Sequence, residues 1–187
     1  MDLAIETSGV LVAIGDPWGA WRTLLSLLKP GGVMSIGLYS EVARRDIVVA
    51  QKYLAAQGYR ATDEDMRRGR QDIIALDGES PVKKVTNAGD FFSMSNCRDM
   101  LFHVQEHRFA LPQIKEFLAE NGLVLLGFML NEGALKRYAE RFPDDQARTN
   151  LDQWHQFEQE NPDTFISMYQ FWVQKLRAVP TSTETQG

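Results

Sequence analysis

The sequence has a single cysteine, Cys97, among its 187 residues, which excludes an intramolecular disulfide framework and any multi-thiolate metal site. A reducing compartment fits this usage best, so we expect a cytoplasmic protein. An excess of positive charge is also missing, because 20 lysines and arginines stand against 25 aspartates and glutamates, for a net charge of -5. We therefore expect neither nucleic acid nor an anionic membrane as a partner.

Long apolar runs are absent as well. The opening MDLAIETSGVLVAIGD contains Asp2 and Glu6, has no basic leader and is too short to span a bilayer, so we interpret it as strand structure. No glycine-rich G-x-G-x-x-G spacing occurs anywhere in the sequence. The sequence is 44% hydrophobic and 24% charged, and this composition predicts one globular domain with a substantial core.

The first forty residues predict a strand, a helix and a second strand. Residues 3–7 are a short apolar run, and Asp16 and Pro17 suit the N-cap and first position of a helix with an apolar stripe. Residues 29–32 (KPGG) end that helix before the strand at residues 33–39 (VMSIGLY). Short connections in this order imply a parallel pair with a right-handed crossover.

Two further strands are predicted later in the chain. Residues 123–130 (LVLLGFML) form the clearest one, and the aromatic and β-branched residues at 165–176 favour a strand over a helix. Residues 77–90 lack periodicity and predict a loop or an irregular edge. Helical patterns occur at residues 41–57, 63–76, 111–121, 132–141 and 150–160.

A family resemblance rests on three segments. GVLVAIGDPWGAWRTLLSLLKPGGVMSIGLYSE resembles class I S-adenosylmethionine-dependent methyltransferases from their fourth strand, through a helix, to their fifth strand. CRDMLFHVQEHRFALPQIKEFLAENGLVLLGF and NPDTFISMYQFWVQK are similar to a bacterial subgroup, some of whose members carry tetratricopeptide repeats ahead of the methyltransferase domain. The resemblance covers nearly the whole chain but only the carboxyl-terminal half of the family fold.

This resemblance implies an α/β fold with an incomplete Rossmann-like methyltransferase sheet, made of the fourth to seventh strands with the last one antiparallel. It also implies a helical insertion, where we expect a lid or an acceptor-binding region, since long insertions in compact domains are usually functional. The expected division is a strand-helix-strand core at 1–40, the insertion at 41–110, a helix-strand-helices-strand unit at 111–179 and a flexible tail at 180–187.

The resemblance also implies a missing part. In the family, a glycine-rich loop after the first strand and an acidic residue closing the second hold the cofactor, whereas this chain begins at the fourth strand. We therefore expect S-adenosylmethionine to bind in the complete enzyme and weakly or not at all to this chain alone. A bare apolar edge invites pairing, which predicts a homodimer near residues 3–14, a complementing chain, or a poorly soluble truncation product.

Candidate site residues follow the strands, because ligands of open α/β sheets bind beyond the carboxyl ends of the strands. The resemblance places four residues near the methionine end of the cofactor and the methyl acceptor, although a plain strand-ending turn is an equal alternative. These residues are Glu6, Thr7, Ser8 and Gly9.

The candidate acceptor-binding residues are Tyr39, Glu41, Arg44 and Glu106. Arginine suits an acceptor with carboxylate or phosphate groups, but ordinary helix-surface charge explains Glu41 and Arg44 equally well. His103 and His107 lie four residues apart and would share one face of a helix, so they are the candidate catalytic bases. Structural hydrogen bonding is the alternative, and we predict no metal site because a third ligand is missing.

Two function classes remain open from the sequence. The first is part of a methyltransferase that acts on an unknown small-molecule or protein acceptor and lacks activity without the amino-terminal half. The second is a noncatalytic interaction module or truncated gene product that retains the distal half of the fold.

Overall fold

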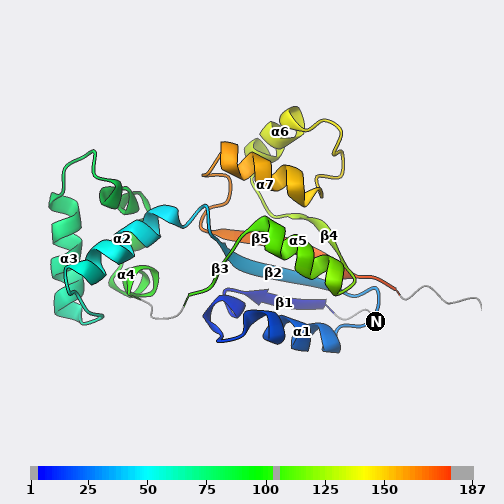
Figure 1. Cartoon of the computed structure of the whole chain (residues 1–187), viewed down its shortest axis with the longest axis horizontal. Coiled ribbons are helices and arrows are strands. Elements are labelled where there is room, and N and C mark those ends of the chain that lie inside the picture. The colour runs from blue at the N-terminus through cyan, green and yellow to red at the C-terminus, as the bar shows by residue number, and fades with distance from the viewer. Residues whose placement is uncertain (1–3, 103–105, 178–187) are drawn as a thin grey trace, which may run out of the picture.

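The computed structural model describes residues 4–102 and 106–177. Figure 1 shows a sheet with helices packed against it and a separate group of helices to one side. The α-helices are α1 (Pro17–Leu27), α2 (Arg45–Ala56), α3 (Asp63–Ala75), α4 (Met94–Leu101), α5 (Leu111–Glu120), α6 (Glu132–Arg141) and α7 (Leu151–Glu160). Short 3-10 helices occur at Leu11–Ala13, Pro81–Asn87 and Gly89–Phe92.

The sheet has the spatial order β1 (Ala4–Ser8), β2 (Val33–Ser40), β5 (Met168–Lys175) and β4 (Leu123–Phe128). The short β3 (Arg108–Phe109) pairs with the end of β2 beyond the last residue of β1. β1 and β2 are parallel, whereas β5 runs antiparallel to both of its neighbours. The α/β fold with an antiparallel last strand is therefore confirmed, and β1 is an outermost strand of the described sheet.

Helix α1 begins and ends where the sequence predicts. The Asp16 side chain accepts a hydrogen bond from the first turn at 2.9 Å, and Pro17 occupies the first helical position. At the other end, the ammonium of Lys175 on β5 donates to the carbonyl oxygens of Leu25 and Leu28, at 2.8 and 2.9 Å. The last strand thus satisfies carbonyl groups that a helix terminus leaves unpaired.

One face of the sheet is covered by helices. Ile36 and Phe171 pair across β2 and β5 and point to this face, where both are buried. Trp21 of α1 lies 4.3 Å from the ring of Phe117 of α5 and 6.3 Å from that of Phe171. Further along, Phe128 of β4 meets the α7 residue Trp154 edge-on. The core of the sheet therefore lies between this face and the helices α1, α5 and α7.

The opposite side of the sheet is called the open face below. Residues directly opposite one another in the strand registers share a face, and many of those on this side are exposed. A bulge between Leu125 and Gly127 shifts the register of β4, so that Gly127 pairs with Trp172 and Leu126 lies next to this pair. The open face consists of Ala4, Glu6, Ser8, Val33, Ser35, Gly37, Tyr39, Val124, Leu126, Met168, Gln170, Trp172 and Gln174.

The helices α2, α3 and α4 form an insertion with an apolar core of its own. The helices predicted at 41–57 and 63–76 are confirmed, although α2 begins only at Arg45. The segment 77–90, predicted as loop, contains the 3-10 helix Pro81–Asn87, whose Val85 is buried in this core. Turns this short leave no periodicity in the sequence, which is why the pattern did not indicate them. No helix in the described part of the chain is long and apolar enough to cross a membrane.

Candidate functional site

The candidate site lies where β1 and β2 end and β5 begins. The antiparallel direction of β5 brings its first residue, Met168, opposite Tyr39 near the end of β2. Ser8, the last residue of β1, lies opposite Gly37 and approaches the Met168 sulfur with its hydroxyl at 3.6 Å. A Cβ atom on Gly37 would lie 2.5 Å from the Ser8 hydroxyl and 2.8 Å from that sulfur. The close approach of β1, β2 and β5 at this point therefore requires glycine at position 37.

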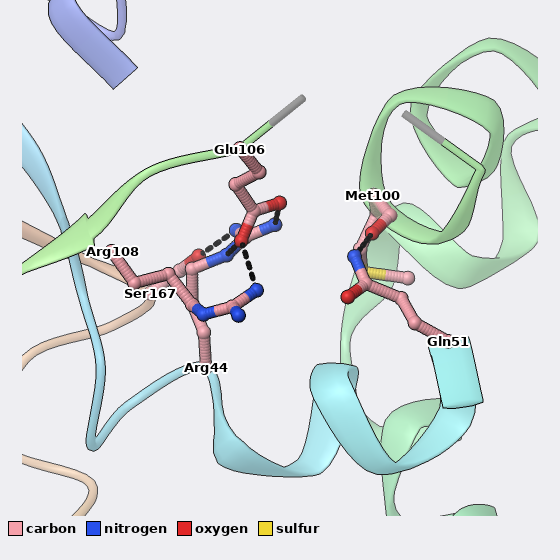
Figure 2. A network of polar contacts seen from close by, with 6 residues as sticks. All are labelled: Arg44, Gln51, Met100, Glu106, Arg108 and Ser167. Carbon is pink, nitrogen blue, oxygen red and sulfur yellow. Dashed lines mark hydrogen bonds and ion pairs between the residues drawn. The ribbon is translucent and has the colours of Figure 1, made fainter. Parts of the chain in front are cut away.

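Figure 2 shows a buried ion pair between Arg44 and Glu106, next to Ser167, which directly precedes Met168. The Arg44 side chain donates through Nε and Nη2 to both carboxylate oxygens of Glu106, at 2.8 and 2.7 Å. Its Nη1 donates to the Ser167 hydroxyl at 2.6 Å, and its guanidinium lies 3.9 Å from the centre of the Tyr39 ring. Side-chain exposure is only 5% for Arg44 and 6% for Glu106. We call Arg44, Glu106 and Ser167 the clasp.

The clasp joins three segments that are distant in sequence. Arg44 precedes α2 at the start of the insertion, Glu106 lies where the chain leaves the insertion, and Ser167 precedes β5. Ser167 has a φ of 66°, which is uncommon for a residue other than glycine, and its hydroxyl is engaged by Arg44. The clasp thus fixes both ends of the insertion to the edge of the sheet at which ligands of such folds bind.

Arg44 contacts two of the other three predicted acceptor-binding residues, Tyr39 and Glu106. Glu41 is exposed on the turn after β2, and its backbone N–H donates to the Phe109 carbonyl. Arg44 already donates two hydrogen bonds to Glu106, whose carboxylate also pairs with Arg108 at 3.4 Å. An anionic acceptor would have to displace that carboxylate before Arg44 bound it.

A cavity of about 400 Å³ lies between the clasp and the insertion. Tyr39, Arg44 and Ser167 line it from the sheet side, together with Ile166, whose side chain is exposed. The insertion contributes polar side chains on the opposite wall. These are Asn87, Asp90, Asn96 and Asp99.

The four residues predicted to lie near the cofactor do not share one environment. Glu6 and Ser8 point to the open face, whereas Thr7 points to the covered face, is 8% exposed and has no hydrogen-bond partner for its hydroxyl among the described residues. Gly9 turns the chain away with a φ of +72°. The four predicted cofactor-binding residues therefore point to different sides of the sheet, and the sequence contains no glycine-rich G-x-G-x-x-G turn of the kind that holds a nucleotide cofactor.

The two histidines do not share a helix face. α4 ends at Leu101, and His107 lies outside any helix, directly before β3, where its backbone N–H donates to the Val12 carbonyl at 2.8 Å. The helical spacing assumed for the pair is therefore wrong at His107, because the chain leaves α4 before this residue and enters β3 directly after it. His103 lies outside the described residues. The buried Nε2 of His107 has no partner within the described ranges.

Residues 4–102 and 106–177 contain no group of three or more histidine, cysteine, aspartate or glutamate side chains placed to hold a metal ion.

The sequence analysis did not predict two residues that contribute to the site, Ser167 and Met168. The predicted antiparallel strand at 165–176 could have indicated them, because an antiparallel last strand begins at the edge of the sheet where the parallel strands end.

A buried carboxyl group, Glu158 of α7, lies under the end of β2 and was also missed. It is 1% exposed, and both of its oxygens accept from the Tyr169 hydroxyl, at 2.8 and 2.9 Å. The Nδ1 atom of His155 lies 3.5 Å from the carboxyl group. Burial raises the pKa of Glu158, and the hydrogen bond from the Tyr169 hydroxyl opposes this only in part.

Stability should therefore depend on the charge of Glu158. Because its pKa is raised on folding, its contribution is complete below the pKa of the unfolded chain and is lost as the pH rises through the folded value. Glu158→Gln stays neutral, so we expect its stability relative to the wild type to increase with pH. Urea unfolding of both proteins from about pH 4 to about pH 8 measures this difference.

Glu160→Gln is the matched control. Hydrogen bonding to Arg141 lowers the pKa of Glu160, so its contribution is present above the unfolded pKa and is lost as the pH falls. Its relative stability should therefore move in the opposite direction. Identical pH profiles for the two variants would contradict the raised pKa of Glu158.

The comparisons with known proteins identify the fold. No protein-family model matches the sequence. An uncharacterized protein of Synechococcus sp. is 29% identical over 132 residues, which cover 66% of this chain and 31% of that protein. PKMT2 from Rickettsia typhi in complex with AdoHcy aligns with a TM-score of 0.64 at 12% identity, and another structure of PKMT2 aligns with 0.65 at 13%.

Both PKMT2 alignments cover 95% of this chain but only 36% of the PKMT2 chain. The chain thus spans about a third of the length of these relatives. At such identities the likeness defines the fold alone, which is an α/β fold of the type found in a protein that binds AdoHcy.

Proposed function

We propose that this chain is the carboxyl-terminal part of a class I methyltransferase that transfers a methyl group from S-adenosylmethionine to an acceptor. The observation that supports this most strongly is the sheet order β1-β2-β5-β4 with only β5 antiparallel, together with its likeness to AdoHcy-bound PKMT2. AdoHcy, S-adenosylhomocysteine, is what remains of S-adenosylmethionine after the methyl group has left. We assign the chain to the bacterial subgroup that its segments resemble, and to the cytoplasm.

The described residues supply one side of such an active site. Ser8, Gly9 and Met168 border the place where the reactive end of the cofactor would lie, and the cavity beside the clasp would receive the acceptor. Methyl transfer needs an acceptor atom aligned with the sulfonium carbon, so positioning supplies most of the rate enhancement. In this proposal the clasp holds the insertion, and hence the acceptor wall, against the end of β2.

The cofactor site requires more polypeptide than the described residues. The free edge of β1 is where a further parallel strand and its glycine-rich turn would be added, either by the same polypeptide or by a complementing chain. The residues present lack those backbone amide donors, so affinity for AdoHcy should be low. We expect a dissociation constant of about 1 mM or weaker for the 187-residue chain.

Isothermal titration calorimetry of the 187-residue chain with AdoHcy tests this requirement. The expected result is little or no heat at micromolar protein, with the folded state checked by circular dichroism. A micromolar dissociation constant would show that these residues complete the cofactor site on their own. That result would contradict the partial nature of the site and leave the methyltransferase assignment intact.

The second candidate is a noncatalytic interaction module. It is favoured by the open face, on which Glu6 is the one charged residue among those named, and by the pairing of Arg44 with Glu106, both of which suit a binding surface better than a reaction centre. The two candidates differ in where AdoHcy acts, because the module predicts no interaction at Ser8 and Gly9 at any concentration.

A further inference from the structure

Glu158 is a buried carboxyl group that the proposed reaction does not use. It is 1% exposed, and it forms no ion pair with an arginine or lysine among the described residues. The titratable groups that face it are His155 of its own helix, α7, and Tyr169 of β5. Burial, Glu158 and the carboxylate of Glu41 on the turn after β2 all raise the pKa of Tyr169, so its hydroxyl keeps its proton. Burial beside no fixed cation favours the neutral form of a carboxyl group.

The contacts between Glu158 and Tyr169 also favour a protonated carboxyl group. The Tyr169 oxygen lies 2.8 Å from one carboxyl oxygen and 2.9 Å from the other. A phenol has one hydrogen to donate, and this hydrogen can point to only one of the two oxygens at a time. A proton on the carboxyl group can be donated back to the phenol oxygen, so the neutral acid accounts for both contacts. An ionised carboxylate would leave one of its oxygens buried without a hydrogen bond.

Tyr169 connects this carboxyl group to the clasp. It is the second residue of β5, follows Ser167 by two positions and is 0% exposed. The Ser167 carbonyl accepts from the Ser40 backbone N–H at 3.1 Å, and the Ser167 hydroxyl accepts from Arg44 at 2.6 Å. Ser167 is therefore held from two sides, by Arg44 and by the pair of Tyr169 with Glu158. Tyr169 points to the covered face, so this pair does not depend on the free edge of β1.

The turn at Ser167 needs contacts on both sides because its backbone is strained. The Met168 N–H donates to the Ile166 carbonyl at 2.8 Å, and Ser167 between them has a φ of 66°. A three-residue turn with a positive φ is the rare, strained form of the γ-turn. Such conformations persist only while the surrounding structure holds them. Loss of the contacts on either side should therefore let this turn relax.

We propose that the proton on Glu158 controls whether Ser167 stays in the clasp. While the proton is present, Tyr169 holds the start of β5 and Ser167 remains bonded to Arg44. Once the proton is lost, the buried carboxylate has no counter-ion, so the segment 161–168 opens to admit water and the Ser167 hydroxyl leaves Arg44. Glu158 and Tyr169 are thus positioning residues for one side of the clasp.

The direction of the pH dependence follows from burial. Because burial raises the pKa of Glu158 in the folded chain, the proton is held at low pH, and the clasp opens as the pH rises towards the folded value. Ile166 and Ser167 line the acceptor cavity, so this opening would change the acceptor wall. That consequence rests on the proposed function, whereas the coupling of Glu158 to Ser167 is a property of the chain and stands or falls independently of AdoHcy binding.

Hydrogen exchange of the Ser40 backbone N–H, followed by NMR of the labelled 187-residue chain, tests the coupling, because this group is bonded to the Ser167 carbonyl. The rate in the wild type is divided by the rate in Glu158→Gln, which removes the intrinsic pH dependence of exchange. Above the pKa of an accessible glutamate, about 4.3, this ratio should rise by up to about tenfold per pH unit, and it should level off at the folded value.

Two variants and one reference group make the test specific. Tyr169→Phe removes the hydroxyl that joins Glu158 to β5, so the pH dependence of the Ser40 exchange should disappear. His155→Gln should keep it, because the histidine is not the group that loses the proton. The indole N–H of Trp154, bonded to the Arg148 carbonyl at 2.8 Å, reports on opening of the aromatic core and should not follow the Ser40 signal.

Circular dichroism at each pH establishes that every protein is folded. A ratio that does not change with pH would overturn the proposal. Loss of the dependence in His155→Gln would overturn it too, because the proton would then belong to the histidine. An equal rise of exchange at the Trp154 indole would also contradict it, since ionisation of Glu158 would then open the core and not the turn at Ser167.

Discussion

Glu106→Ala should lower the free energy of unfolding by about 3–5 kcal/mol, because the change leaves the guanidinium of Arg44 buried without a counter-ion. Arg44 is 4% exposed, and in the wild type two of the three hydrogen bonds of its side chain go to Glu106. Equilibrium unfolding in urea measures the loss.

The control for this prediction is Asp163→Ala. Asp163 forms an ion pair with Arg45 at 3.4 Å, but its side chain is 96% exposed, so its removal should cause no measurable loss. The double variant Arg44→Met with Glu106→Leu should recover most of the stability lost by Glu106→Ala, because it removes both buried charges. Equal losses in Glu106→Ala and Asp163→Ala would mean that the clasp is solvated in solution.

Trp154→Ala should cost about 3–5 kcal/mol as well, through an unfilled cavity in the aromatic core. Trp154 of α7 is 0% exposed and stacks on Tyr138 of α6 at a ring distance of 3.6 Å. Its indole N–H donates to the Arg148 carbonyl at 2.8 Å, so the substitution also removes a hydrogen bond from the turn between the two helices. Thermal and urea unfolding should agree on the loss.

Phe92→Ala is the matched aromatic control for the Trp154 prediction. Phe92 is 60% exposed and contacts Phe91 by its ring edge, so its removal should cost less than about 1 kcal/mol. A loss for Trp154→Ala no larger than that for Phe92→Ala would show that α6 and α7 can separate from the sheet without breaking the fold.

The sheet was predictable from the sequence because its signals are local. Asp16 and Pro17 start α1, the KPGG turn ends it, and the apolar residues of 33–39 and 123–130 became β2 and β4. The choice of strand at 165–176 was correct because Tyr169, Phe171 and Val173 alternate towards the covered face.

The site was less predictable because it is assembled from side chains distant in sequence. Arg44 and Glu106 are 62 positions apart, and no pattern in the sequence pairs them. The buried position of Glu158 had a weak signal, since it follows Trp154 by four residues on the apolar side of α7. His107 was misplaced because a strand of two residues, β3, leaves no periodicity to read.

We propose that the ends of β1 and β2 form one wall of a cofactor site. The most direct test is amide NMR of the isotopically labelled 187-residue chain during titration with AdoHcy to millimolar concentration. We predict fast-exchange shifts confined to the backbone amides around Ser8, Gly9 and Tyr39, with none along β4. Shifts that cluster elsewhere, or none at the highest concentration, would contradict the assignment.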